Sequence, residues 1–151
     1  ELLHALRKQS MEENRQKFYE VALSFLGKDV TPRDEVPDEV ACAITINAIH
    51  TKAFGYPIGG GASTYLLYHA LLDSKHFTKI DQPEWGAVLI SPSGYGSGRL
   101  SNGHAGIIGK QDDIISNDSK SGLFVKNYTL DTWSARYKAL GGYPMAYFRR
   151  I

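Results

Sequence analysis

The sequence predicts an α+β fold in which N-terminal helices pack on a small antiparallel sheet. Apolar residues recur at spacings of three and four over the first half of the chain, which indicates amphipathic helices. Beyond about residue 85 the apolar segments are short, partly β-branched and separated by turn residues, which is typical of strands. Because the two kinds of segment are separated along the chain rather than alternating, an α+β fold is favoured.

Three helices are expected in the first half of the chain. The first covers residues 2–26 and ends at Gly27, a natural C-terminal stop. The second runs from Val40 to about Phe54 with Asp38 as its cap. It is apolar on more than one side and is therefore expected to be central. The third covers residues 65–72 and is capped by Ser63 or Thr64.

The second half is expected to supply the sheet. Strands are predicted at residues 85–91, 104–109, 114–116, 123–127 and 145–150. Asp112 and Asp113 form the turn of a hairpin between the second and third of these strands. A short helix is expected at residues 130–140, with Asp131 as its cap and Trp133 and Tyr137 on one face.

Length and composition indicate one soluble globular domain, residues 1–151, in which an N-terminal helix (1–27) precedes the main body (36–151). A net charge of +1 argues against nucleic-acid binding, and no apolar run approaches the ~20 residues of a membrane span. No signal peptide is recognised in the first ten residues. A single cysteine excludes an internal disulfide and a cysteine-rich zinc site.

That single cysteine, Cys42, is the candidate nucleophile. It stands near the start of the second predicted helix, where the helix dipole stabilises a thiolate and backbone N–H groups can hold an oxyanion. The alternative is a core residue between Ala41 and Ala43.

His104 is the candidate base for this nucleophile. It opens a strand directly after the glycine- and serine-rich loop of residues 92–103, where small residues let a substrate backbone come close. The other four histidines lie in or beside predicted helices and are expected to be surface or packing residues: His4, His50, His69 and His76. A strand-end histidine without a role is the alternative for His104.

A base also needs an orienting group for its second ring nitrogen. The hairpin brings the end of the next strand, Asn117-Asp118, back towards His104. Asn117 is expected to accept from the imidazole N–H, with Asp118 as the alternative. The alternative is that Asn117-Asp118 forms an ordinary turn and has no catalytic role.

Three stretches resemble the NlpC/P60 and CHAP cysteine peptidases: Val40-Ala41-Cys42-Ala43, Trp85-Gly86-Ala87-Val88-Leu89-Ile90 and Gly103-His104-Ala105-Gly106-Ile107-Ile108. The resemblance implies a papain-like core that hydrolyses peptidoglycan without a cofactor. It implies Cys42 as nucleophile, His104 as base and Asn117 as the polar third member. Arg99, Asn102 and Asp118 are expected to contact the substrate, Arg99 by meeting a stem-peptide carboxylate.

The expected function is therefore cysteine-dependent cleavage of amide bonds in cell-wall peptidoglycan, outside the cytoplasm. The enzyme would be an endopeptidase or an N-acetylmuramoyl-L-alanine amidase, with peptidoglycan stem peptides as its partners. Small domains of this kind are frequent in phage lysins, an analogy only. Two alternatives stay open: a non-catalytic module of a phage particle, and a cysteine acyltransferase or deamidase with a non-wall substrate. The bond cleaved and the oligomeric state also stay open.

Overall fold

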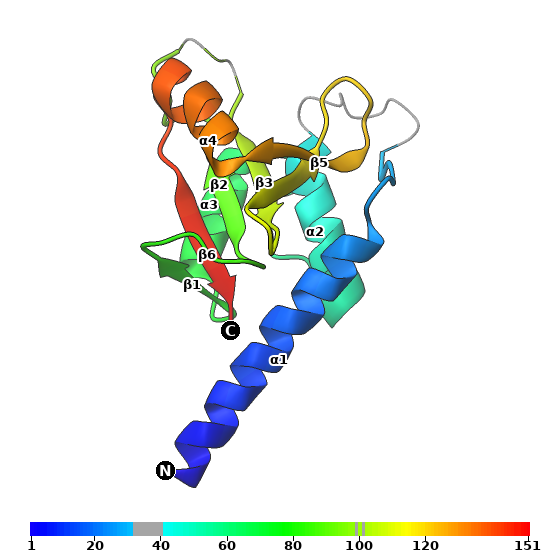
Figure 1. Ribbon diagram of the computed structural model, residues 1–151, viewed down its shortest axis with the longest axis vertical. Coiled ribbons are helices and arrows are strands. Elements are labelled where there is room, and N and C mark those ends of the chain that lie inside the picture. Colours follow the sequence, from blue (N-terminus) through cyan, green and yellow to red (C-terminus); the bar gives the residue numbers. More distant parts are fainter. Residues whose placement is uncertain (32–40, 99, 101) are drawn as a thin grey trace.

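The computed structural model describes residues 1–31, 41–98, 100 and 102–151. Within them, one antiparallel sheet of six strands has the order β1-β6-β2-β3-β4-β5. Helices α1, α2 and α3 cover one face of this sheet, and α4 lies on the other (Figure 1). The predicted α+β class is confirmed.

The elements follow the predicted order. The helices are α1 (Leu2–Ser24), α2 (Ala41–Phe54), α3 (Thr64–Asp73) and α4 (Leu130–Trp133), and α4 continues into the π-helical segment η2 (Ser134–Leu140). The strands are β1 (Phe77–Ile80), β2 (Val88–Ser91), β3 (His104–Ile108), β4 (Asp113–Asn117), β5 (Phe124–Thr129) and β6 (Ala146–Arg150).

Most local predictions for these elements hold. The Ser63 side chain caps α3 by accepting from the N–H of Leu66. Asp112 lies in the β3–β4 turn, as predicted, and takes a positive φ of 62°. Asp113, also predicted in the turn, is the first residue of β4. The predicted cap Asp38 and the first residue expected in that helix, Val40, lie outside the described residues.

Two local expectations need correction. The helix at Leu130 is capped by Thr129 rather than by Asp131, because Thr129 and Thr132 form a reciprocal capping box. Asp131 lies instead in the first turn, where its charge suits the helix dipole. Strand β1 was not predicted: it has four residues, pairs only with β6 at the edge of the sheet, and carries no long apolar pattern.

The core has two layers, one on each face of the sheet. On the face covered by α1, α2 and α3, the strands contribute residues such as Ile90, Ala105 and Ile107. On the opposite face, Leu89, Ile108 and Ile114 pack with α4 and η2. Strands β2, β3 and β4 are buried almost throughout, because each of them has packed side chains on both faces.

Only the C-terminal part of α1 belongs to the core; its N-terminal part projects from the body of the protein (Figure 1). Phe18 is fully buried and its ring contacts those of His50 and Phe77. Arg15 further anchors the helix, because its Nε and Nη2 donate to the backbone oxygen of Trp85 at 3.1 and 3.0 Å.

We predict that Phe18→Ala lowers the free energy of unfolding by about 3–5 kcal/mol, because it removes a fully buried ring and leaves a cavity. Urea denaturation measures the loss. Leu3→Ala is the control in the same helix; Leu3 is 61% exposed, so a change of no more than about 0.5 kcal/mol is expected. Equal midpoints for the two variants would mean that α1 lies outside the cooperative core.

Candidate active site

Cys42 lies at the second position of α2, as the sequence predicted, but it is buried. Its side chain is 2% exposed, and burial raises the pKa of the thiol from 9.0 to about 11. Backbone hydrogen bonds from Ala105, Ala43 and Cys42 itself lower the pKa, but by less than burial raises it. The resting group is therefore a neutral thiol, and the predicted thiolate stabilisation by the helix start is outweighed by desolvation.

His104 is the first residue of β3, and aromatic rings fix its orientation. Its ring packs against Trp133 at a centroid distance of 5.1 Å and against Tyr137 at 5.5 Å. Trp133 is itself fixed, because its Nε1 donates to Ser91 Oγ at 3.0 Å.

A chain of hydrogen bonds sets the tautomer of His104. Ser116 Oγ donates to Asn127 Oδ1 at 2.6 Å and lies 2.9 Å from His104 Nε2. Since a hydroxyl has one hydrogen, and Ser116 gives it to Asn127, Ser116 accepts from Nε2–H of the imidazole. Nδ1 is then the nitrogen with the free lone pair, and it is the atom that can act as a base.

The sheet register explains why Ser116 and Asn127 meet. Ser116 pairs with Gly106, so its side chain is on the same face of the sheet as that of His104. The pairing of β4 with β5 shifts between Ile114 and Ile115, and Asn127 is the extra residue of that β-bulge. The bulge turns the Asn127 side chain towards Ser116.

The prediction for Asn117 is corrected by this register. Asn117 follows Ser116, so its side chain leaves on the opposite face of β4, towards α2, where Oδ1 accepts from Thr45 Oγ1 at 3.4 Å. Ser116 occupies the orienting position instead. Asn117 connects β4 to the helix that carries Cys42.

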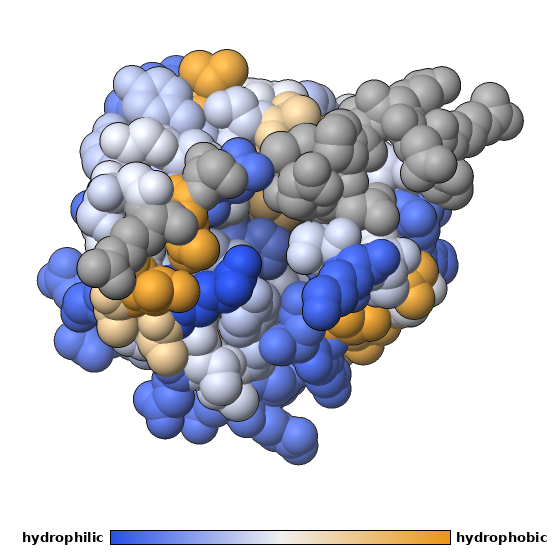
Figure 2. Space-filling model, turned by 90° about the horizontal axis from the view of Figure 1, so that it is seen from above, coloured by the Kyte–Doolittle hydropathy of each residue, from blue (hydrophilic) through white to orange (hydrophobic). Residues whose placement is uncertain are grey.

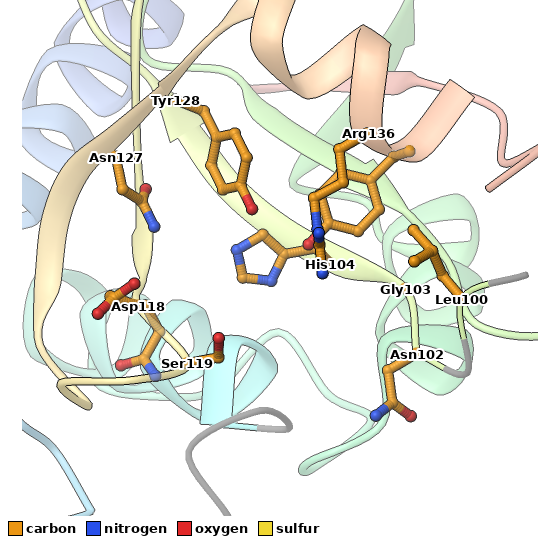
Figure 3. A pocket seen from close by; sticks show the side chains of 11 residues that line it. Leu100, Asn102, Gly103, His104, Asp118, Ser119, Asn127, Tyr128 and Arg136 are labelled. Atoms are coloured by element: carbon orange, nitrogen blue, oxygen red, sulfur yellow. The ribbon is translucent and has the colours of Figure 1, made fainter. Parts of the chain in front are cut away.

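Two adjoining pockets contain the candidate residues. The histidine pocket, about 260 Å³, is shown in Figure 3. Figure 2 shows that the molecule is hollowed on the face seen from above, with hydrophilic and hydrophobic residues beside the hollow. The lining of the histidine pocket is Leu100, Asn102, Gly103, His104, Asn117, Asp118, Ser119, Asn127, Tyr128, Arg136 and Tyr137. The cysteine pocket, about 400 Å³, is lined by Cys42, Ala62, Ser63, Thr64, Ser93, Asn102 and Gly103.

Cys42 and His104 are therefore neighbours, but they are not hydrogen bonded to each other. The thiol contacts the backbone of Ala105, the residue next to His104. Successive side chains of a strand point to opposite faces, so the imidazole leaves on the face away from α2. The two pockets meet at Asn102 and Gly103, which line both.

Gly103 is required at this junction by sterics. A Cβ there would lie 2.1 Å from the backbone oxygen of Ser91 and 2.5 Å from the nitrogen of Ser93. The Gly103 N–H also donates to Ser93 Oγ at 2.9 Å. Only a glycine lets the start of β3 pack this closely on the end of β2 while leaving both pockets open.

The electrostatics of the histidine pocket keep His104 neutral. Burial lowers its pKa most, and the positive charge of Arg136 lowers it further, while the carboxylate of Asp118 opposes both; the resulting pKa is about 4. At neutral pH the imidazole is therefore a free base with its proton on Nε2.

The predicted substrate contacts divide into three cases. Asn102 lines both pockets, and Asp118 lines the histidine pocket. The backbone N–H of Ser121 also donates to Asp118 Oδ2 at 2.8 Å, so Asp118 stabilises the β4–β5 turn as well. Arg99 lies outside the described residues.

Sequence reasoning missed Ser116, Asn127, Tyr128 and Arg136. Ser116 could have been found from strand alternation, because it shares the face of His104 in the predicted hairpin. Asn127 depends on a bulge that no sequence signal marks. Arg136 depends on the π-helical turns of η2, which place it beside Tyr137 at the pocket.

No family model and no curated protein matches the chain. Among the residues that the structure describes, no group of three or more His, Cys, Asp or Glu side chains could hold a metal ion. Within the same residues, no helix has the length and apolar character needed to cross a membrane.

The lowered pKa of His104 predicts a pH-dependent stability. Between pH 6.5 and about 4 the unfolded chain binds a proton at this position that the folded protein does not, so the free energy of unfolding falls as the pH is lowered through this window. The lowered pKa of His104 corresponds to a total loss of about 3 kcal/mol in the free energy of unfolding on acidification. Urea denaturation at neutral pH and at pH near 4 should show a smaller acid loss for His104→Gln than for the wild type.

His4→Gln is the matched control, because His4 lies on the exposed part of α1. It should keep the wild-type acid loss. If His104→Gln and His4→Gln lose the same stability on acidification, His104 is not held neutral by the fold.

Proposed function

We propose that the chain is a cysteine-dependent amide hydrolase of the NlpC/P60 or CHAP type, acting on peptidoglycan stem peptides outside the cytoplasm. One observation carries the proposal. The His104–Ser116–Asn127 chain leaves the lone pair of Nδ1 free in a pocket that adjoins the pocket of Cys42, the only cysteine in the chain. The three stretches that resemble these families include both residues.

In the proposed reaction a substrate amide lies over Gly103 and contacts both pockets. The Cys42 sulfur attacks the carbonyl carbon. Because the thiol and the imidazole face adjoining pockets, the thiol proton passes to His104 Nδ1 through a water molecule at the junction of the two pockets. When the C–N bond breaks, that proton goes to the leaving amine, and a thioester to Cys42 remains. Water, losing a proton to His104, then releases the carboxylic acid and restores the thiol.

Backbone groups at the start of α2 support the charged stages of this reaction. The backbone N–H groups of Cys42 and Ala43 already hydrogen bond to the sulfur, and they are the donors that we propose for the developing oxyanion. Ser116 and Asn127 can stabilise the imidazolium that forms, because Nε2–H keeps its acceptor throughout. Asp118 adds a favourable negative charge.

The pKa values of Cys42 and His104 mean that the proton is transferred only when substrate is bound. A thiol with a pKa of about 11 does not give its proton to an imidazole with a pKa of about 4 in the resting site. The attack must therefore be concerted with this transfer, so that the oxyanion contacts offset its cost. The resting enzyme is a neutral pair rather than a thiolate–imidazolium pair.

A non-catalytic binding or structural module is the second candidate, and one observation favours it. The Cys42 side chain is 2% exposed and its thiol is neutral, as expected for a cysteine that only fills the core. In that case the histidine pocket would bind a ligand without turnover.

The test is digestion of purified peptidoglycan, with the released fragments identified by mass spectrometry. We expect the wild type to release stem-peptide fragments, Cys42→Ala to release none, and His104→Ala to be slower by at least about a hundredfold. Fragment masses identify the bond cleaved.

The single thiol provides a control within the wild-type chain. Reversible modification with methyl methanethiosulfonate should abolish release, and dithiothreitol should restore it. Undiminished release by Cys42→Ala would rule out a cysteine mechanism. A folded wild type that releases nothing from several wall types would leave the binding module or a non-wall amide as the better explanation.

A further inference from the structure

We infer that Arg136 forms a carboxylate-binding subsite in the histidine pocket and selects peptides that carry a free carboxylate next to the bond presented to Cys42. The link to Cys42 rests on the proposed function, whereas the subsite itself rests on the residues of the pocket.

Arg136 reaches the pocket from an irregular helix. Segment η2 is π-helical over seven residues, and wide turns of this kind are frequent at functional sites. The Arg136 side chain lies at the wall of the pocket, close to His104, and Tyr128 lies near them (Figure 3). Arg136 also contacts Tyr137, another lining residue. Its guanidinium carbon lies 5.6 Å from the centre of the Tyr137 ring.

The charge of Arg136 has no carboxylate partner within the described part of the chain. The ion pairs found there within 4.0 Å use Arg15, Arg149 and Lys126, and none uses Arg136. Its hydrogen bond is with the Tyr137 side chain, which also bonds to Tyr128. A guanidinium held by neutral phenols keeps N–H donors for a bidentate anion.

A carboxylate suits this pocket better than a more highly charged anion. Asp118, another lining residue, is a carboxylate and would repel a dianion such as phosphate. The volume of about 260 Å³ is below the ~300 Å³ at which pockets begin to enclose drug-sized ligands, so it suits one or two residues of a peptide. A peptide amide could meanwhile bond to Asn102 or Ser119.

The position of the subsite allows one peptide to contact both Cys42 and Arg136. Gly103 and Asn102 join the two pockets, so a peptide whose amide lies at Cys42 can pass over Gly103 and place its carboxylate at Arg136. A bound anion would also reduce the effect of the Arg136 charge on His104 and make the imidazole a better base.

The test uses Cys42→Ala protein, in which no turnover can occur, and two probes that differ only in charge. N-acetyl-D-alanyl-D-alanine and its C-terminal amide are titrated against the protein by NMR. We expect the acid to bind at least tenfold more tightly than the amide and to shift the His104 and Arg136 signals. Adding Arg136→Gln should abolish this preference, and Arg136→Lys should keep part of it.

Arg7→Gln is the matched control, because Arg7 is an exposed arginine on the projecting part of α1. It should leave the preference unchanged. Arg136 is exposed, so its variants are expected to fold, and their thermal midpoints verify this.

Equal affinity for the two probes, a failure of both to bind, or a preference that survives in a folded Arg136→Gln protein overturns the subsite. A preference for the acid that depends on Arg136, found together with no release of wall fragments by the wild type, upholds the subsite and rejects hydrolysis by Cys42 instead.

Discussion

The alternation of side chains along β3 is the constraint on which the rest of the site depends. Ala105 points to α2 and receives the helix that carries Cys42, so His104, one residue earlier, has to point to the other face. The same alternation in β4 sends Ser116 to the imidazole and Asn117 to Thr45. A shift of one residue in either strand would exchange these roles and would also move the apolar core residues to the wrong face.

The interactions that orient His104 also suppress its charge. Trp133 and Tyr137 bury the ring, and Ser116 anchors Nε2, so the imidazole has one position and one tautomer. The desolvation that accompanies this order lowers its pKa. Cys42 shows the same compromise, because its position in the core between α2 and β3 aligns the thiol with backbone N–H groups but stabilises the protonated form.

The two pockets have different chemical characters that follow from the two faces of the sheet. The cysteine pocket lies between the starts of α2 and α3 and the loop after β2, and its lining is made of small residues. The histidine pocket lies between the β4–β5 turn and η2, and its lining is polar and aromatic and carries Arg136 and Asp118. Gly103 connects them because no larger residue fits between β3 and the end of β2. This arrangement favours bond cleavage in the cysteine pocket and substrate recognition in the histidine pocket.

The sequence by itself determined the α+β class, the position of Cys42 at a helix start, the glycine before His104 and the β3–β4 hairpin, because each depends on local periodicity or turn chemistry. Only the tertiary structure decided that the thiol and the imidazole face different pockets, and that Ser116 rather than Asn117 meets His104. It alone placed Asn127, through a bulge, and Arg136, through a π-helix, at the site. Only the tertiary structure also decided the ionisation states of Cys42 and His104. Desolvation shifts a pKa according to the residues that pack around the group, and these come from distant parts of the chain.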